Sequence, residues 1–179
     1  MPAGGYSVTA RAVDNAGAAA VSAPVTITVK AASGGSGTVQ YVRLQADSEI
    51  NGNAWTSMAE FNLLDTSGAV IPRTDWSVVA DSAELTGEYA PAASAIDGDP
   101  STFWHTQWQA ASPRPPHTYT VNLGSARSVG GFKYLPRPGG GNGTIADWRF
   151  YTSADGVAWT LVSQGTFANN AAEKTVTFP

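Results

Sequence analysis

The feature that most limits how this chain can fold is a series of short segments in which apolar and polar residues alternate. Alternation with a period of two is typical of β-strands that bury one face, and these segments are rich in β-branched and aromatic residues. They occupy positions 39–44, 61–64, 76–79, 119–123, 129–135, 148–151, 159–162 and 175–178. Helical periodicity is almost absent, apart from a single helical turn expected at 57–60. Many short strands predict an all-β sandwich or barrel.

Turn-forming sequences separate the predicted strands. Asp155-Gly156 stands between two alternating segments, which is a strong signal for a β-hairpin. The glycine-rich stretch 139–143 lacks the following Lys-Ser/Thr of a phosphate-binding loop. We therefore interpret 139–143 as a surface loop.

Residues 1–30 form a separate part of the chain. The sequence YSVTARAVDNAG…APVTITV contains two alternating segments around a turn and resembles the last two strands of a bacterial immunoglobulin-like repeat. We interpret 1–30 as the C-terminal hairpin of such a domain and 31–37 (AASGGSG) as a flexible linker. Residues 38–179 are then long enough for one domain. The alternative is that 1–30 is an edge hairpin of that domain.

Composition excludes several classes of protein. The net charge is −4, and no cluster of Lys and Arg marks a nucleic-acid surface. The absence of cysteine excludes disulfides, thiolate zinc sites and cysteine nucleophiles. No apolar run approaches the length of a membrane span. If the protein is secreted, we expect its signal peptide to lie outside this sequence.

Catalytic motifs are also missing. The chain has only two histidines, and neither an HExxH nor a G-x-S-x-G sequence occurs. The acidic residues lie mostly in turns, where Asp is common in any protein. We therefore expect no enzyme active site in this chain.

The loop 97–102 is a candidate cation site. Asp97-Gly-Asp99-Pro-Ser-Thr102 places oxygen-bearing side chains at short intervals, and calcium takes six to eight oxygen ligands. The loop does not match an EF-hand, because Trp108 stands where the bidentate Glu would be needed. An ordinary D-G-D-P turn is the alternative, and one loop cannot supply a complete ligand set.

The neighbouring segment 102–108 is a candidate sugar site. It contains Trp104, His105 and Trp108, and consecutive residues of a strand face opposite sides. A sugar needs a flat aromatic face for its C–H groups and polar groups for its hydroxyls. Arg137 lies between two prolines and is conformationally restrained. For each of these residues alone, a purely structural role remains the alternative.

Several separated motifs together resemble the discoidin-like, coagulation-factor type C (F5/8 type C) domains. They are AIDGDPSTFWHTQW, PPHTYTVNLG, YLPRP, NGTIADWRFYTSADGVAWTLVSQGTFAN and YVRLQADSEINGNAWTSMAEFNLL. Within that family the sequence is most similar to the galactose-binding modules of galactose oxidase and bacterial sialidases. The resemblance implies a jelly-roll-like β-sandwich. Its YVRL segment usually closes the domain but here opens it, which implies a circular permutation with 39–64 beside 173–178.

The resemblance also implies two sets of site residues. The sugar-binding set is Glu88, His105, Trp108, Arg137 and Asn142. The set for a structural calcium ion combines carbonyl, carboxylate and hydroxyl oxygens of Ala59, Glu60, Ser94, Asp97, Asp99 and Thr102.

These observations lead to a functional expectation. We expect a non-catalytic carbohydrate-binding module, monomeric within a multidomain bacterial chain, that holds a larger secreted protein on galactose-type glycans. One alternative is a discoidin-like module that binds protein or phospholipid, although loop tips of Gly, Pro and Ser disfavour membrane insertion. Another is a fragment of a secreted carbohydrate-active enzyme whose catalysis lies elsewhere.

Overall fold

The computed structural model describes residues 4–29 and 37–178. The chain divides into two compact units, Met1–Ser33 and Gly34–Pro179. The expected linker at 31–37 lies outside the described residues except for its last position. Within the described ranges the only helical element is the short 3-10 helix η1 (Ala92–Ala95), and no helix there could span a membrane.

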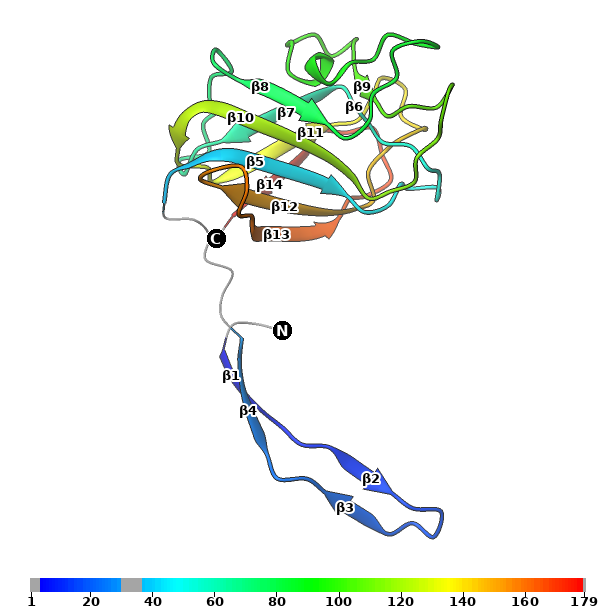
Figure 1. Ribbon diagram of the computed structural model, residues 1–179, viewed down its shortest axis with the longest axis vertical. Coiled ribbons are helices and arrows are strands. Elements are labelled where there is room, and N and C mark those ends of the chain that lie inside the picture. Colours follow the sequence, from blue (N-terminus) through cyan, green and yellow to red (C-terminus); the bar gives the residue numbers. More distant parts are fainter. Residues whose placement is uncertain (1–3, 30–36, 179) are drawn as a thin grey trace. The chain divides into compact units, whose positions relative to one another are not determined.

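The N-terminal unit is a hairpin in which each predicted strand is interrupted (Figure 1). Its strands are β1 (Gly4–Val8), β2 (Arg11–Val13), β3 (Ala19–Val21) and β4 (Val25–Val29). β1 pairs with β4, and β2 pairs with β3, both antiparallel. Asp14 closes the central turn, because its Oδ1 accepts hydrogen bonds from the N–H groups of Ala16 and Ala18.

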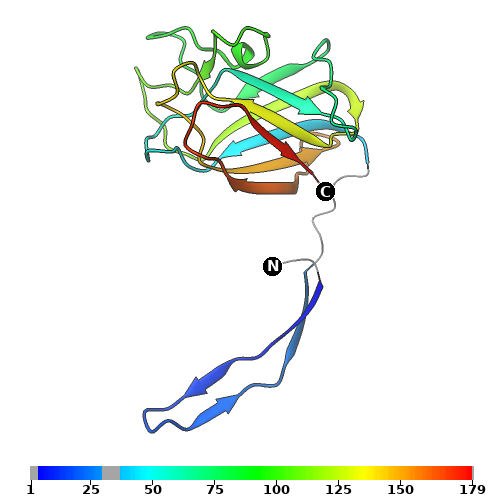
Figure 2. The same ribbon diagram turned by 180° about the vertical axis from the view of Figure 1, so that it is seen from behind.

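The C-terminal unit is a sandwich of two antiparallel sheets, seen from opposite sides in Figures 1 and 2. The larger sheet has the strand order β13-β12-β5-β10-β8, and the smaller has the order β14-β11-β7. Their bounds are β5 (Val39–Ala46), β7 (Glu60–Leu64), β8 (Ser77–Ala80), β10 (His117–Arg127), β11 (Gly131–Leu135), β12 (Asp147–Ser153), β13 (Thr160–Thr166) and β14 (Lys174–Thr177). The all-β sandwich predicted from the alternating segments is confirmed.

The hairpin predicted at Asp155-Gly156 joins β12 to β13. The Asp155 carboxylate accepts hydrogen bonds from the N–H groups of Val157 and Ala158. Gly156 has a φ of 76°, which glycine adopts without the steric cost that a Cβ atom would add.

Aromatic residues from both sheets fill the core. Phe132 of β11 stacks on Phe150 of β12, with ring centroids 4.9 Å apart and planes 5° apart. Trp104 and Tyr119 are also buried and lie 5.1 Å apart between ring centroids. In β5 the inward positions Val42, Leu44 and Ala46 alternate with partly exposed ones, as its sequence pattern predicts.

The helical turn expected at 57–60 is wrong. Residues 57 and 58 form β6 (Ser57–Met58), which pairs with β9 (Trp104–His105), and Glu60 begins β7. Between them, the Ala59 N–H donates to the Leu135 carbonyl oxygen. Hydrogen bonds to strands distant in the sequence therefore satisfy the backbone N–H and C=O groups that a helical turn would have paired locally.

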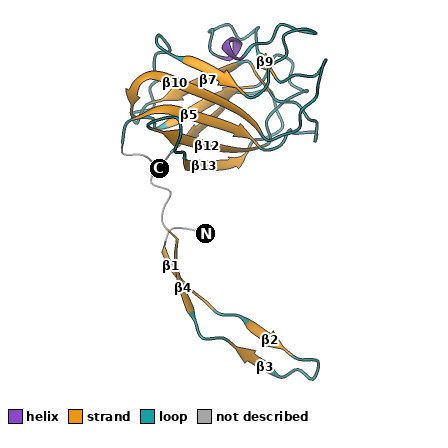
Figure 3. Cartoon of the chain, in the orientation of Figure 1, coloured by secondary structure: helices purple, strands orange, loops and turns teal. Residues whose placement is uncertain are grey.

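The expected placement of 39–64 beside the last strand also needs correction. β11 lies between β7 and β14, while β5 belongs to the other sheet, between β10 and β12. The opening segment thus supplies strands to both sheets. Loops gather at the end of the sandwich that carries β9 (Figure 3). The candidate site lies among these loops.

Candidate functional site

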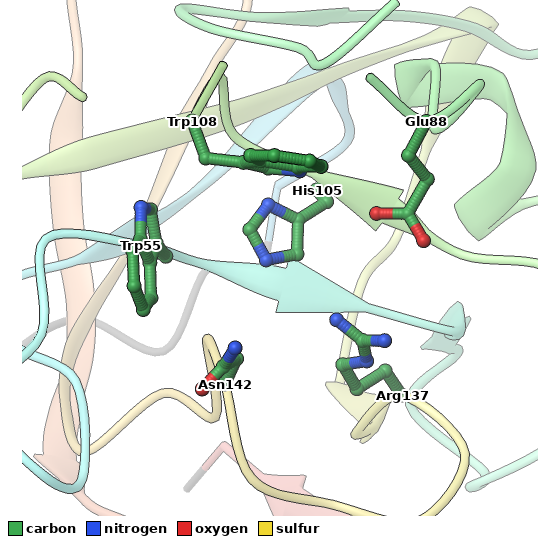
Figure 4. Close-up of a pocket in the computed structure, with 6 residues that line it drawn as sticks. All are labelled: Trp55, Glu88, His105, Trp108, Arg137 and Asn142. Carbon is green, nitrogen blue, oxygen red and sulfur yellow. The ribbon is translucent and has the colours of Figure 1, made fainter. Parts of the chain in front are cut away.

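A pocket of about 300 Å³ opens among the loops beside β6 and β9. Its volume is at the small end of the range for ligand pockets. It is lined by Trp55, Glu88, His105, Trp108, Arg137 and Asn142. The structure therefore brings together all five residues that the resemblance assigned to a sugar site, although they come from segments far apart in the sequence (Figure 4).

Trp108 supplies an aromatic wall that is accessible from solvent. Trp108 is 41% exposed, which is unusual because tryptophan is highly buried on average. The other candidate, Trp104, is 1% exposed, and its indole Nε1 donates to the Ser82 carbonyl oxygen. Trp104 is thus a core residue, and Trp108 is the one placed to meet a ligand.

His105 forms the centre of the pocket (Figure 4). Its Nδ1 lies 2.6 Å from the Thr106 carbonyl oxygen, which can only accept, so Nδ1 carries the proton. Nε2 of the neutral ring is then a hydrogen-bond acceptor. Burial lowers the pKa of His105, and the Arg137 charge lowers it further, which keeps the ring neutral at pH 7.

Arg137 and Glu88 lie on the side of the pocket opposite Trp55 (Figure 4). The Arg137 guanidinium carbon is 4.3 Å from the centroid of the Phe103 ring, a cation–π contact that limits its movement. Arg137 offers only hydrogen-bond donors, whereas a carboxylate such as that of Glu88 offers acceptors. Together they can bond both the lone pairs and the proton of a sugar hydroxyl.

Asn142 is held by contacts between its loop and β6. The Ser57 hydroxyl donates to the Asn142 carbonyl oxygen over 2.8 Å, and the Ser57 N–H donates to the Gly143 carbonyl oxygen, also over 2.8 Å. Gly143 has a φ of 83°, and a Cβ atom there would come within 2.6 Å of the Ser57 nitrogen. Only glycine permits this close approach, which directs Asn142 toward the pocket.

Trp55 is a pocket residue that the sequence analysis missed. Its indole Nε1 donates to the Ser112 hydroxyl over 3.1 Å, and its ring centroid lies 6.5 Å from that of His105. In Figure 4 the indoles of Trp55 and Trp108 form adjoining sides of the pocket. Its place directly after the loop sequence NGNA is the one signal in the sequence, and that signal is not distinctive.

The candidate calcium residues are placed in two groups. In the first, the Thr102 hydroxyl lies 2.7 Å from Asp97 Oδ2, 3.1 Å from the Asp99 carbonyl oxygen and 3.4 Å from the Ser94 carbonyl oxygen. One hydroxyl proton cannot satisfy three acceptors, so this cluster is rich in oxygen and poor in donors. The Asp99 Oδ1 atom accepts hydrogen bonds from the Ser101 N–H and hydroxyl.

The second group is Glu60 with the preceding Ala59. Glu60 Oε2 pairs with Arg73, while the buried Oε1 has no hydrogen-bond partner among the described residues. Burial raises the pKa of the Tyr119 hydroxyl, the charge of Arg73 opposes this increase, and the charges of Glu60 and Asp97 add to it. In the described part of the chain no three acidic or His side chains converge on one point. The oxygens available are mainly carbonyl, hydroxyl and single carboxylate groups, which suit calcium.

The fold of the second unit is a two-sheet β-sandwich with a pocket among the loops at one end. The F5/8 type C domain model matches residues 77–179, and the chain belongs to this family. The resemblance stated from the sequence is thereby confirmed.

Two curated relatives show where such domains occur. A sialidase of Micromonospora viridifaciens is 39% identical over 101 residues, which are 55% of this chain and 16% of the sialidase. A galactose oxidase of Gibberella zeae is 36% identical over 141 residues, 75% of this chain and 18% of the oxidase. The chain therefore spans less than a fifth of the length of these relatives.

A solved structure agrees with the fold. CpGH89CBM32-5 from Clostridium perfringens, in complex with GalNAc-β-1,3-galactose, is 31% identical with a TM-score of 0.56. The match covers 60% of this chain and 78% of that chain.

Proposed function

We propose that the Gly34–Pro179 unit is a non-catalytic carbohydrate-binding module whose pocket takes a galactose-type pyranose. The observation that carries the proposal is the pairing of two indoles with acidic, basic, amide and imidazole groups in one small pocket. A pyranose presents the complementary surface, with an apolar C–H face and a ring of hydroxyls. The solved relative bound to GalNAc-β-1,3-galactose supports the same ligand class.

The side chains have distinct roles in this proposal. Trp108 packs against the apolar face of the ring, and Trp55 adds an apolar side. The Nε2 atom of His105 and the carboxylate of Glu88 accept hydrogen bonds from hydroxyls. Arg137 donates charge-assisted hydrogen bonds to hydroxyl or ring oxygens, and Asn142 can donate and accept.

Affinity for a single sugar should be weak. A monosaccharide has few atoms and exchanges many water hydrogen bonds on binding, which gives a Kd of about 0.1–1 mM, or about 4–5 kcal/mol. Useful attachment would then come from several modules acting together. We propose that the module acts as a monomer within a larger secreted protein, and that catalysis, where present, lies outside this chain.

We also propose a structural calcium ion. It would be held by oxygens of Ala59, Glu60, Ser94, Asp97, Asp99 and Thr102. The unpartnered Glu60 Oε1 and the donor-poor cluster around the Thr102 hydroxyl support it. Bound there, the ion would join the β7 segment to the loop that precedes β9 and stabilise the base of the pocket.

The order of the strands supports a permuted domain. Residues 39–76 lie outside the matched family region, yet they supply β5 to the middle of the larger sheet and β7 to the smaller one. We propose that they replace a segment that closes the domain in relatives.

A glycan array tests the proposal most broadly. Binding confined to glycans with terminal galactose or N-acetylgalactosamine is expected. Binding to phospholipid vesicles without binding to any glycan would contradict it and favour the lipid-binding alternative.

A further inference from the structure

Glu84 is a buried acidic residue that belongs neither to the pocket lining nor to the calcium group. It is 0% exposed, and no ion pair involves it among the described residues. A charge removed from water in this way needs several hydrogen bonds to be tolerated. The donors that surround it come from two different loops.

The first carboxylate oxygen organises the loop that carries Glu88. Glu84 Oε1 accepts from the Thr86 N–H at 2.9 Å, the Thr86 hydroxyl at 2.8 Å and the Gly87 N–H at 2.9 Å. The loop is closed by a bridge in which the Ala90 N–H donates to the Glu84 carbonyl oxygen over 2.9 Å. Glu88 belongs to the segment that this bridge closes.

The second carboxylate oxygen organises the segment that carries Trp108. Glu84 Oε2 accepts from the Trp108 N–H at 2.8 Å and from the Gln109 N–H at 2.9 Å. The Glu84 N–H itself donates to the His105 carbonyl oxygen over 2.8 Å. One residue therefore contacts the backbone of two pocket residues and closes the loop of a third.

We infer that Glu84 is the positioning residue of the pocket, whose carboxylate fixes the backbone of Trp108 against the loop of Glu88. The inference rests on the proposed function for its effect on sugar affinity. All four backbone donors and the hydroxyl point at one carboxylate, and only an ionised carboxylate can accept from all of them. These bonds hold the pKa of Glu84 far below its usual range, so it is charged at any pH used for binding.

Glu84→Gln is the matched test, because it keeps size and shape but turns one acceptor oxygen into an NH₂ donor. In protein without sugar, amide hydrogen exchange at Trp108 and Gln109 should accelerate by about tenfold or more. Affinity for D-galactose, measured by calorimetry, should fall by about tenfold. Asp65→Asn is the control, since Asp65 caps a turn at the end of β7 away from Glu60 and Arg137. It should change neither quantity.

Two further variants separate positioning from general loss of stability. Thr86→Val removes only the hydroxyl donor and should weaken galactose binding in the same direction by a few-fold. In a Trp108→Phe background, Glu84→Gln should cost less affinity than in the wild type, because both changes affect the same contact. Fully additive losses would contradict positioning through Trp108.

The outcomes distinguish the two claims. If wild-type protein does not bind galactose, the proposed function fails, and the exchange rates of Trp108 and Gln109 still decide the role of Glu84. If Glu84→Gln leaves those exchange rates and the affinity unchanged, or if Thr86→Val leaves the affinity unchanged, the inference about Glu84 is overturned.

Discussion

The indole of Trp108 lies directly against Gly87. A Cβ atom added to Gly87 would clash with the side-chain oxygen of Gln109 and would come within 2.8 Å of Trp108 Cη2 and 2.9 Å of Cζ2. Gly87 is not among the glycines with positive φ. Glycine is therefore needed here because it has no side chain that would occupy the space of the indole ring. The position of the aromatic wall therefore depends on the absence of a side chain one loop away.

Gly87→Ala should displace the Trp108 ring and weaken sugar binding. We expect a loss of galactose affinity of about tenfold, with a small change in Tm, because the loop is at the surface. Calorimetry and thermal melts measure the two effects. Gly37→Ala is the control, since a Cβ atom there meets nothing within 4 Å. Equal affinity in the two variants would show that Trp108 does not need the space at Gly87.

Galactose affinity should be independent of pH from about 8 down to about 6.5, the ordinary pKa of histidine. Burial and Arg137 lower the pKa of His105, while the Thr106 hydrogen bond, Glu88 and Glu84 raise it, with a net lowering. Below that depressed pKa, Nε2 gains a proton and can no longer accept. Affinity should then fall. An affinity that rises on acidification would contradict the acceptor role of His105.

Affinity is a better readout here than stability, because the two histidines act in opposite directions. The lowered pKa of His105 means that the unfolded chain binds more protons, so the free energy of unfolding falls as pH drops through about 6.5. The pKa of His117 is raised overall. Burial lowers this pKa, but the hydrogen bonds to Asp81 and to the Ala54 carbonyl oxygen outweigh the effect of burial. Its contribution is lost as pH rises through the raised pKa.

Removal of calcium should lower the Tm. A ligand at a hundredfold excess over its Kd stabilises by about 2.7 kcal/mol, which is about 5–10 °C for a domain of this size. Glu60→Ala should lower the Tm and abolish the effect of chelator. Glu173→Ala is the control, because Glu173 forms an exposed ion pair with Lys133, and this variant should still respond to chelator. Wild-type melting curves that coincide with and without added calcium, in protein first freed of metal, would contradict the site.

Deletion of residues 1–37 should leave the Tm of the module nearly unchanged. The hairpin exposes apolar residues and has only two-stranded pairing, which is marginal in water by itself. Differential scanning calorimetry of both proteins checks this. A loss of more than a few degrees would show that the hairpin stabilises the sandwich.

The sequence predicted most of the fold because strand alternation is local information. The inward residues Val42 and Leu44 follow from the spacing within the predicted segment 39–44, and the strand continues to Ala46, which is also inward. The single helical turn at 57–60 was wrong because β6 is defined by its pairing with β9, about fifty residues away. No local pattern contains that partner.

The site was predicted in part. The motifs around His105, Trp108 and Arg137 supplied its composition only through their resemblance to a family. Trp55 was missed, since a single tryptophan beside a loop has no distinctive pattern. Glu84 was also missed, because the Trp108 and Gln109 donors that make it interpretable lie 24 and 25 residues further along the chain.

The most direct test of the central claim is the affinity of Trp108→Ala for D-galactose, compared with Trp159→Ala. Trp159 is a matched control, because it stacks on Arg43, with the guanidinium carbon 3.9 Å from the ring centroid, and does not line the pocket. Calorimetry should show weak binding in the wild type and in Trp159→Ala, and no measurable binding in Trp108→Ala, with the calcium-dependent Tm unchanged. Full galactose binding by Trp108→Ala, or unfolding of that variant, would contradict the account.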